Sequence, residues 1–495
     1  MRDWLSQRAK LSPEDVALIF KNEQWTYAQL NESVHAVAGI LHEKGINAGA
    51  HVGILLQNRP IYVVIIHALA RLRAVTVPLN LRLKSNELSW QISQAECVFI
   101  LCSNESKDRL SDLELKNLEM ILVDSMGWPT VINRASNLET QPFLFDLEAV
   151  QGIYFTSGTT GRPKGAMLTF KNHLWSAMGS AYRLGHHSDD RWLLVLPLYH
   201  IGGQAVVFRA CQYGITIVLQ ERFDAEDLYQ ALKMHQVSIV SLVPTMLQRL
   251  ILSFDDDGVP EKLRCILLGG ATAPQSLVDH CLARNIPIAL TYGLTEAASQ
   301  VATASPAQVR LNPGTVGKPL FSCELHIVRQ GNAECQPYEV GEIVVTGETI
   351  MQGYFHAQEA TETALFQGGL HTGDLGYLDE SGNLWVVSRR TDLIISGGEN
   401  VYPIEVENVL LSHPAVREAC VVGIDDPEWG QRVYALVVKD ALEVSEQELI
   451  AYCRKHLAAY KRPYMVHFLD QIPRTASGKI LRNAAKEQLE SIVAI

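Results

Sequence analysis

Short apolar runs rich in β-branched residues recur along the first part of the chain and alternate with segments of helical spacing. The runs occupy residues 52–56, 75–79, 98–101, 215–219, 239–243 and 266–268. Between them, segments 224–235 and 274–284 begin at a turn or capping residue and carry apolar side chains along one helix face. Strands that alternate with helices are typical of α/β layers. The pattern predicts a large N-terminal α/β region of layered sheets and helices.

The pattern changes near residue 390. Runs at 419–423 and 433–438 predict strands, and Ser445-x-x-Glu448 then has the form of a capping box that begins a helix. A chain of 495 residues is also longer than one ordinary hydrophobic core supports. We therefore predict two domains, residues 1–390 and a smaller α+β domain over residues 391–495.

The overall composition argues against nucleic-acid and membrane functions. The net charge is −12, and no run of Lys or Arg is long enough to follow a phosphate backbone. The longest apolar stretch, residues 63–70 with His67 inside it, is shorter than the ~20 residues that cross a bilayer. The N-terminal residues contain no apolar signal region, so the expected compartment is the cytoplasm.

The nine cysteines give no sign of a metal site or a redox motif. They are scattered, none forms a C-x-x-C pair, and no histidines accompany them at zinc-binding spacing. The sequence therefore predicts free thiols inside the protein.

A loop rich in small residues follows a short apolar run and has the composition of an anion-binding loop. Residues 156–165 read Thr-Ser-Gly-Thr-Thr-Gly-Arg-Pro-Lys-Gly. Glycines let the backbone approach an oxyanion, and hydroxyls, amides and a lysine supply donors and charge. It is not a Walker loop, because Lys164 is followed by Gly165 rather than by Ser or Thr. The candidate phosphate-binding residues are Thr156, Ser157, Gly158, Thr159, Thr160, Gly161 and Lys164. The alternative is a flexible surface linker.

Further motifs follow in a fixed order, and together with this loop they resemble the adenylate-forming superfamily of acyl-CoA synthetases, luciferases and adenylation domains. The matching segments are residues 197–203, 269–271, 292–296, 371–374, Arg389 with Asp392, 396–403 and 473–479. Any one of them alone carries little weight, because small-residue turns after strands are common. The resemblance covers nearly the whole chain. It implies an ATP-dependent enzyme that makes an acyl-adenylate.

The resemblance assigns the nucleotide side of the site. It implies that Thr295 contacts the α-phosphate and that Glu296 holds Mg²⁺, a hard cation that prefers carboxylate and phosphate oxygens. A charge at a helix N-terminus is the alternative reading of Glu296. The further nucleotide contacts that it implies are Gly269 and Gly270, Tyr292 stacked on adenine, and Asp374 and Arg389 on the ribose. For Tyr292, a buried core tyrosine is an equally good interpretation.

The resemblance also implies a mobile lid. Lys479, in the motif Arg-Thr-Ala-Ser-Gly-Lys, matches the lysine that serves adenylation, and its charge could bridge the acid and the α-phosphate. In this family the C-terminal domain then rotates about a pivot near Thr391 and brings Gly397 and Gly398 to the thiol. Many relatives carry Asp or Lys at that hinge, so Thr391 is a departure. His200 resembles a gate beside the acid pocket, although a lone histidine is more often structural.

The acid itself is suggested by a narrower resemblance to the branch of the family that activates 2-succinylbenzoate for coenzyme A in menaquinone biosynthesis. The segments that carry it are residues 4–8, 57–59, 190–194, 264–270, 317–323 and 392–400. That acid keeps a second, ionised carboxylate in the pocket, which needs a cation or several donors. We predict Arg209 as the cation and Ser299 and Gln300 as donors. The alternative for Arg209 is that it points outward from an amphipathic helix.

Other functions remain open from the sequence. A ligase for another aromatic or medium-chain acid would share every motif, and transfer to a separate carrier protein would differ only in the acceptor. Coenzyme A is the expected acceptor, because the chain carries no fused carrier domain after Lys479. The resemblance also suggests a homodimer, since members of this family are often dimers.

Overall fold

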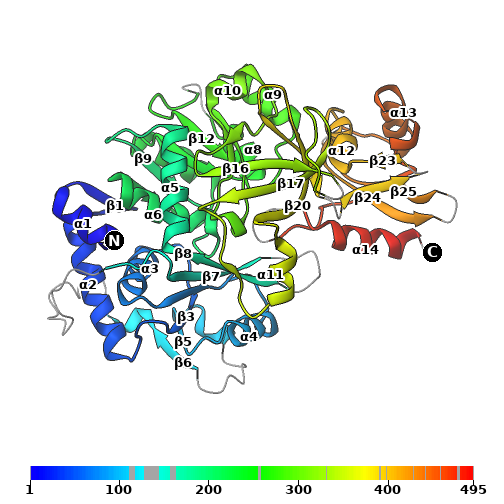
Figure 1. The fold of residues 1–495 in the computed structure, drawn as a ribbon. Coiled ribbons are helices and arrows are strands. Elements are labelled where there is room, and N and C mark those ends of the chain that lie inside the picture. The colour runs from blue at the N-terminus through cyan, green and yellow to red at the C-terminus, as the bar shows by residue number, and fades with distance from the viewer. Residues whose placement is uncertain are drawn as a thin grey trace.

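The computed structural model describes most of the chain, and Figure 1 shows its arrangement. The described residues are 2–110, 118–126, 144–156, 163–254, 258–329, 332–389, 392–396, 399–426, 429–440, 442–457, 459–475 and 480–493. The α/β fold class expected from the sequence is confirmed. The predicted strands and helices are present, with bounds shifted by at most three residues at either end.

The largest sheet has nine strands and forms the upper left of Figure 1. In spatial order they are β15 (Lys318–Pro319), β14 (Ala302–Ala304), β13 (Ile288–Tyr292), β12 (Cys265–Leu268), β11 (Ile239–Leu242), β9 (Arg191–Leu194), β10 (Thr216–Leu219), β1 (Val16–Phe20) and β2 (Glu23–Thr26). The central pairs are parallel, and antiparallel strands close both edges. Apolar β-branched runs suit such strands because helices cover both faces of a parallel sheet.

A second sheet of seven strands lies below the first in Figure 1. Its order is β18 (Gly353–Tyr354), β8 (Lys164–Thr169), β7 (Val150–Thr156), β4 (Val75–Pro78), β3 (His51–Leu55), β5 (Phe99–Cys102) and β6 (Glu119–Leu122). Strands β7 and β8 are antiparallel and flank the glycine-rich loop, so the register Thr156↔Lys164 places these two residues opposite each other at its base.

One hydrophobic core joins these two sheets. It includes Ile54 and Leu101 from the seven-stranded sheet and Leu194 and Ile217 from the nine-stranded sheet. Helix α3 (Pro60–Leu72) is buried at every position, as expected of a helix that is apolar all round. The other helices of this core are α1 (Trp4–Leu11), α2 (Tyr27–Glu43), α5 (Phe170–Leu184) and α6 (Ile201–Tyr213).

The outer helices pack on separate cores. Those of the nine-stranded sheet are α7 (Ala225–Met234), α8 (Pro244–Leu252), α9 (Gln275–Ala283) and α10 (Pro306–Leu311), and α4 (Ser85–Gln94) covers the seven-stranded sheet. The two helices predicted over residues 224–235 and 274–284 are α7 and α9. Asp224 caps α7 by accepting from two backbone amides of its first turn.

A third, antiparallel sheet completes the N-terminal part. Its strands are β16 (Cys323–Val328), β17 (Gly341–Gly347), β20 (Gly369–Leu378), β19 (Leu365–Phe366) and β21 (Leu384–Arg389), and α11 (Gln358–Ala364) precedes β19. Across β20 and β21, the backbone of Asp374 lies opposite that of Arg389. The sheet thus brings two of the predicted ribose residues to neighbouring strands.

The C-terminal elements form a smaller sheet at the right of Figure 1. Its strands are β23 (Glu399–Val401), β22 (Ile394–Ser396), β25 (Gly430–Lys439), β24 (Val416–Asp426) and β26 (Met465–Phe468), with helices α12 (Pro403–Leu411), α13 (Glu446–His456) and α14 (Arg482–Val493). The predicted capping box is present, since Ser445 Oγ accepts from the Glu448 amide. The two cores of this part draw only on residues between 394 and 489.

The cysteines are all free and nearly all buried, as predicted. Among the described residues, no group of three or more His, Cys, Asp or Glu side chains could hold a metal ion by itself. No helix in the described ranges is long and apolar enough to cross a membrane.

Candidate active site

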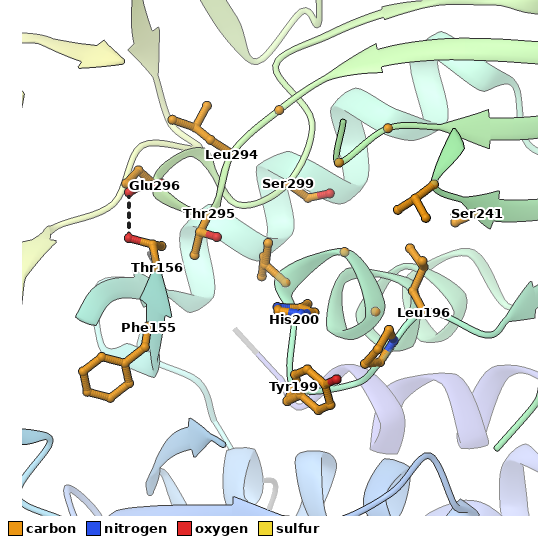
Figure 2. Close-up of a pocket in the computed structure, with 18 of the residues that line it drawn as sticks. Phe155, Thr156, Leu196, Tyr199, His200, Ser241, Leu294, Thr295, Glu296 and Ser299 are labelled. Atoms are coloured by element: carbon orange, nitrogen blue, oxygen red, sulfur yellow. Dashed lines mark hydrogen bonds between the residues drawn. The ribbon is translucent and has the colours of Figure 1, made fainter. Parts of the chain in front are cut away.

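A cavity of about 1510 Å³ is lined by residues from both large sheets and from the third sheet. That volume exceeds the roughly 300–1000 Å³ of an ordinary ligand pocket, so a nucleotide and a second ligand can lie in it together. In Figure 2, Thr156, Thr295 and Glu296 lie at one end of the cavity, and Leu196 lies at the other, beyond His200. We call these the nucleotide end and the acid end.

The nucleotide end is built by the turn that follows β13. Residues Thr295–Ala297 form a single 3₁₀ turn, which directs Glu296 towards β7 and β18. Glu296 Oε1 accepts hydrogen bonds from Thr156 Oγ1 at 3.2 Å and from Tyr354 Oη at 2.9 Å. The turn needs glycine at position 293, because a Cβ there would lie 1.6 Å from the carbonyl oxygen of Ser299.

The charges around Glu296 suit a site for phosphate and a hard cation. Burial, followed by the neighbouring Glu296 carboxylate, raises the pKa of Tyr354 far above its ordinary value, so Tyr354 stays a neutral donor. Lys164 Nζ lies 5.3 Å from the centroid of the Tyr354 ring and lines the same cavity. A carboxylate, a hydroxyl and an ammonium thus converge where the glycine-rich loop begins.

Two predicted nucleotide residues touch each other. Tyr292 Oη donates to Asp374 Oδ2 at 2.8 Å, which joins β13 to β20. Tyr292 is only 8% exposed and belongs to the core beneath the third sheet, while its hydroxyl reaches the cavity wall at Asp374. The core interpretation of Tyr292 is therefore correct for its ring, and the contact with Asp374 connects its hydroxyl to the site.

The small residues after β12 border the same cavity. Gly269 and Gly270 both line it, and a Cβ at Gly269 would come within 2.6 Å of the Thr291 methyl group. Gly270 has a φ of +77°, in the left-handed region that favours glycine. These two positions let a ligand approach the backbone closely.

His200 occupies the N-cap position of α6 and lines the cavity between the two ends. Its ring lies beside that of Tyr199, with centroids 4.7 Å apart, and its Nε2 is buried without a hydrogen-bond partner among the described residues. Burial, with a smaller contribution from Arg82, lowers the pKa of His200 to about 4. His200 is therefore neutral near pH 7, and any gating role would depend on its shape rather than on charge.

Arg209 lines the cavity and is 2% exposed. It lies against Trp192, whose indole nitrogen donates to Ser241, and Ser241 lies on the Leu196 side in Figure 2, at the acid end. Helix α6 is buried on nearly every side, so the interpretation that Arg209 points outward from an amphipathic helix is wrong. Its Nη2 donates to Ser176 Oγ at 3.0 Å, and its guanidinium carbon lies 5.8 Å from the centroid of the Trp192 ring. Its Nε is buried without a hydrogen-bond partner in the described structure.

The surroundings of Arg209 are neutral. Burial, and then the charge of Arg209, lowers the pKa of His173 to about 3, and burial raises the pKa of Tyr213 to about 12. Burial also lowers the pKa of Arg209 itself. No carboxylate of the described residues forms an ion pair with Arg209, although a buried arginine ordinarily requires an anion. An anionic ligand would supply it.

Ser299 and Gln300 follow the turn and also line the cavity. Ser299 has a φ of 99°, and its side chain extends into the space above His200 in Figure 2. The side-chain Nε2 of Gln300 donates to Thr303 Oγ1 at 2.8 Å, and the side-chain Oε1 is buried without a hydrogen-bond partner among the described residues. That these two side chains donate to the acid stays a prediction.

Several predicted residues lie outside the described part of the chain. They are Ser157, Gly158, Thr159, Thr160, Gly161, Thr391, Gly397, Gly398 and Lys479. For Arg389 only the backbone in β21 is described.

The sequence reasoning missed Tyr354 and Ser176. Tyr354 lies in a two-residue strand that no pattern marked. A signal for Ser176 did exist: His173, Ser176 and Ser180 recur at helical spacing among buried positions of α5, where polar residues need a partner.

The chain belongs to the AMP-binding enzyme family. The family model for AMP-binding enzymes matches residues 5–355, and the model for the AMP-binding enzyme C-terminal domain matches residues 405–479. The first match covers most of the residues that line the cavity, and the second covers strands β24, β25 and β26 of the C-terminal sheet.

Within that family, its relatives include 2-succinylbenzoate–CoA ligases. The chain is 41% identical over 492 residues to a ligase of that name from Bacillus cereus, covering 99% of each chain. Its structure is similar to o-succinylbenzoate CoA synthetase from Bacillus subtilis in complex with its acyl-adenylate intermediate, with a TM-score of 0.91, 42% identity and 98% coverage of both chains. It is also similar to the same enzyme in complex with ATP and magnesium, with a TM-score of 0.90, 42% identity and coverage of 98% and 99%.

Proposed function

We propose that this protein is an acid–thiol ligase that activates 2-succinylbenzoate with ATP and transfers it to coenzyme A, a step of menaquinone biosynthesis. ATP and the acid give an acyl-adenylate and pyrophosphate, and the thiol of coenzyme A then displaces AMP to form the thioester. The full-length similarity to ligases of that name supports the reaction. The observation that carries the choice of acid is Arg209, a buried cation at the cavity wall without an acidic partner in the described structure.

Activation must bring two anions together, the acid and the α-phosphate, against their mutual repulsion. The β- and γ-phosphates would be held by Thr156 and Lys164 together with the loop residues Ser157, Gly158, Thr159, Thr160 and Gly161. Thr295 would donate to the α-phosphate. Hydroxyls and backbone amides suit this role because they are aimed before the charge develops.

The oxygen donors at the nucleotide end fit a magnesium ion. Glu296 would hold it together with phosphate oxygens, and the hydroxyls of Thr156 and Tyr354 orient the carboxylate by donating to it. When bound, Mg²⁺ supplies charge neutralisation on the phosphates.

The adenosine would bind beside Gly269 and Gly270, with Asp374 and Arg389 on its ribose and the Tyr292 ring in the core behind Asp374. The two oxygens of Asp374 suit the two ribose hydroxyls. Tyr292 donates to one of them and so orients the carboxylate.

The acid would extend from Thr295 past His200 to Arg209. There the ring carboxylate would pair with the guanidinium, with Ser299 and Gln300 completing its contacts. A planar guanidinium offers two parallel donors to a carboxylate, which suits recognition of this second acid group.

Lys479 would supply the charge that bridges the acid and the α-phosphate during adenylation. Residues 391–495 would then rotate as a lid against residues 1–390 near Thr391 and present Gly397 and Gly398 to coenzyme A. We expect Lys479→Ala to lower adenylate formation about 100-fold or more while sparing thioester formation from supplied acyl-adenylate. Separate assays of pyrophosphate release and adenylate consumption test this, and equal losses in both would contradict it.

Because its substrates are ATP and coenzyme A, we expect the enzyme to act in the cytoplasm, and by analogy with the family to form a homodimer. Light scattering of the purified protein tests the second expectation.

The proposed function is tested by pyrophosphate release with ATP, Mg²⁺ and coenzyme A. The acids are 2-succinylbenzoate, benzoate, 4-coumarate, octanoate and acetate. Selective turnover of 2-succinylbenzoate is expected. Selective turnover of another acid would keep the chemistry and overturn the choice of substrate.

A further inference from the structure

A buried hydroxyl on α5 joins Arg209 to the turn that carries Glu296. Ser176 Oγ donates to the carbonyl oxygen of Ala298 at 2.6 Å and accepts from Arg209 Nη2 at 3.0 Å. A serine hydroxyl has one proton and two lone pairs. Because the proton goes to Ala298, the lone pairs of Ser176 are left to receive the guanidinium.

The carbonyl that anchors Ser176 is itself held in an unusual backbone. Ala298 and Ser299 have φ values of 51° and 99°, a region that residues with a side chain rarely adopt. Hydrogen bonds from their amides to the carbonyls of Thr295 and Leu294 close the turn. Such a backbone persists only when its surroundings hold it, so the Ala298 carbonyl is a fixed reference point for the hydroxyl.

Arg209 has few other restraints. Its guanidinium lies over the Trp192 ring, and its Nε lacks a partner among the described residues. A long side chain with several rotatable bonds loses orientation when a single fixed contact is removed. The Ser176 hydroxyl therefore restricts which guanidinium edge faces the cavity.

We infer that Ser176 is a positioning residue that sets the preference for an acid with a second carboxylate. It holds Arg209 so that the remaining donors face the ring carboxylate. The inference rests on the proposed function, in which Arg209 receives that carboxylate. It adds that the preference depends on a hydroxyl that the acid never touches.

The test compares two acids with the same succinyl chain, 2-succinylbenzoate and 4-oxo-4-phenylbutanoate, which lacks the ring carboxylate. In Ser176→Ala we expect the KM for 2-succinylbenzoate to rise about tenfold, with kcat and the constants for the monoacid changed less than about threefold. The matched control is Ser180→Ala, another buried serine of α5, whose hydroxyl has no hydrogen bond to Arg209 or Ala298 in the described structure. Equal losses for both acids in Ser176→Ala would overturn the inference, because a purely structural role would not discriminate.

A double-mutant cycle with Arg209→Met separates this inference from the proposed function. If Ser176 acts through Arg209, adding Ser176→Ala to Arg209→Met leaves the ratio of kcat/KM values for the two acids unchanged. A further loss would contradict the inference. An unchanged ratio in Arg209→Met alone would instead overturn the assignment of Arg209 to the ring carboxylate.

Should Ser176→Ala fail to fold, Ser176→Cys gives the same comparison, because sulfur is a weaker acceptor of similar shape. Thermal unfolding identifies the folded variants. In Ser176→Cys we expect the ratio of kcat/KM values for the two acids to lie between the wild-type and Ser176→Ala ratios. A wild-type ratio in folded Ser176→Cys would count against the inference.

Discussion

The two ends of the cavity are built on opposite principles. At the nucleotide end, polar groups already pair with one another, as Glu296 does with Thr156 and Tyr354, and Asp374 with Tyr292. At the acid end, Arg209 is buried among neutral groups and has no carboxylate partner in the described structure. The paired groups at the nucleotide end orient side chains that are needed to form an acyl-adenylate from any acid. The acid end leaves one charge for the ligand to satisfy, and so it can select among acids.

The largest expected effect comes from a substitution at the nucleotide end. Glu296→Gln keeps the shape but removes the charge, so we expect pyrophosphate release to fall about 100- to 1000-fold for every acid alike. Measurements across a Mg²⁺ titration check this with 2-succinylbenzoate and 4-oxo-4-phenylbutanoate.

The control for Glu296 is Glu348→Gln, since Glu348 is a carboxylate about half exposed to solvent that pairs with Lys171. A loss in Glu296→Gln confined to the diacid would contradict the division between the two ends.

The next effect breaks the acid end. Arg209→Met should raise the KM for 2-succinylbenzoate about 30- to 100-fold, because the ring carboxylate then enters a pocket without a cation. The KM for ATP and the constants for 4-oxo-4-phenylbutanoate should stay within about threefold. Arg209→Lys keeps the charge but loses the two parallel donors of the guanidinium. Its KM for 2-succinylbenzoate should therefore lie between the values for the wild type and Arg209→Met. An unchanged KM for the diacid in Arg209→Met would show that Arg209 does not bind it.

A stability measurement sharpens the comparison, because the acid end depends on neutral neighbours. His173 has a folded pKa of about 3, whereas an unfolded histidine has a pKa of about 6.5. Between these values the unfolded state binds more protons, so stability is full above about pH 6.5 and falls as the pH decreases towards about 3. When the pH is lowered from about 7 to about 5, this histidine should lower the free energy of unfolding by about 2 kcal/mol.

In His173→Gln that contribution should disappear, so the variant should lose about 2 kcal/mol less than the wild type over the same pH change. Urea unfolding at the two pH values measures the difference. The exposed His187→Gln is the control. Parallel pH dependences of His173→Gln and the wild type would contradict a neutral buried His173.

The smallest effect concerns the orientation of Asp374. Tyr292→Phe removes the hydroxyl that donates to Asp374 and keeps the buried ring, so we expect the KM for ATP to rise about fivefold without a change in acid preference. Steady-state kinetics with varied ATP check this, and Tyr377→Phe, on the same strand as Asp374, is the control. A change in the ratio of the two acids would contradict the separation of the ends.

Sequence reasoning succeeded where the chemistry is local. The α/β layers followed from apolar runs, and the capping box at Ser445 formed as its two residues predict. The bounds of strands and helices shifted by a few residues, because side-chain periodicity does not mark where hydrogen bonding stops. The family motifs predicted roles for Glu296, Asp374 and Tyr292. Glu296 and Asp374 line the cavity, and Tyr292 lies in the core with its hydroxyl on Asp374.

Only the tertiary structure decided the orientation of Arg209. A helix with one arginine among apolar residues is compatible with a buried or an exposed arginine, and α6 is buried because both large sheets and α5 surround it. The contact with Ser176, which lies 33 positions earlier, likewise depends on how α5 packs against α6. By itself, the sequence determined the reaction class and the nucleotide motifs, because these depend on residues close together in the chain. The environment of a single charge depends on segments far apart in sequence, and packing alone brings them together.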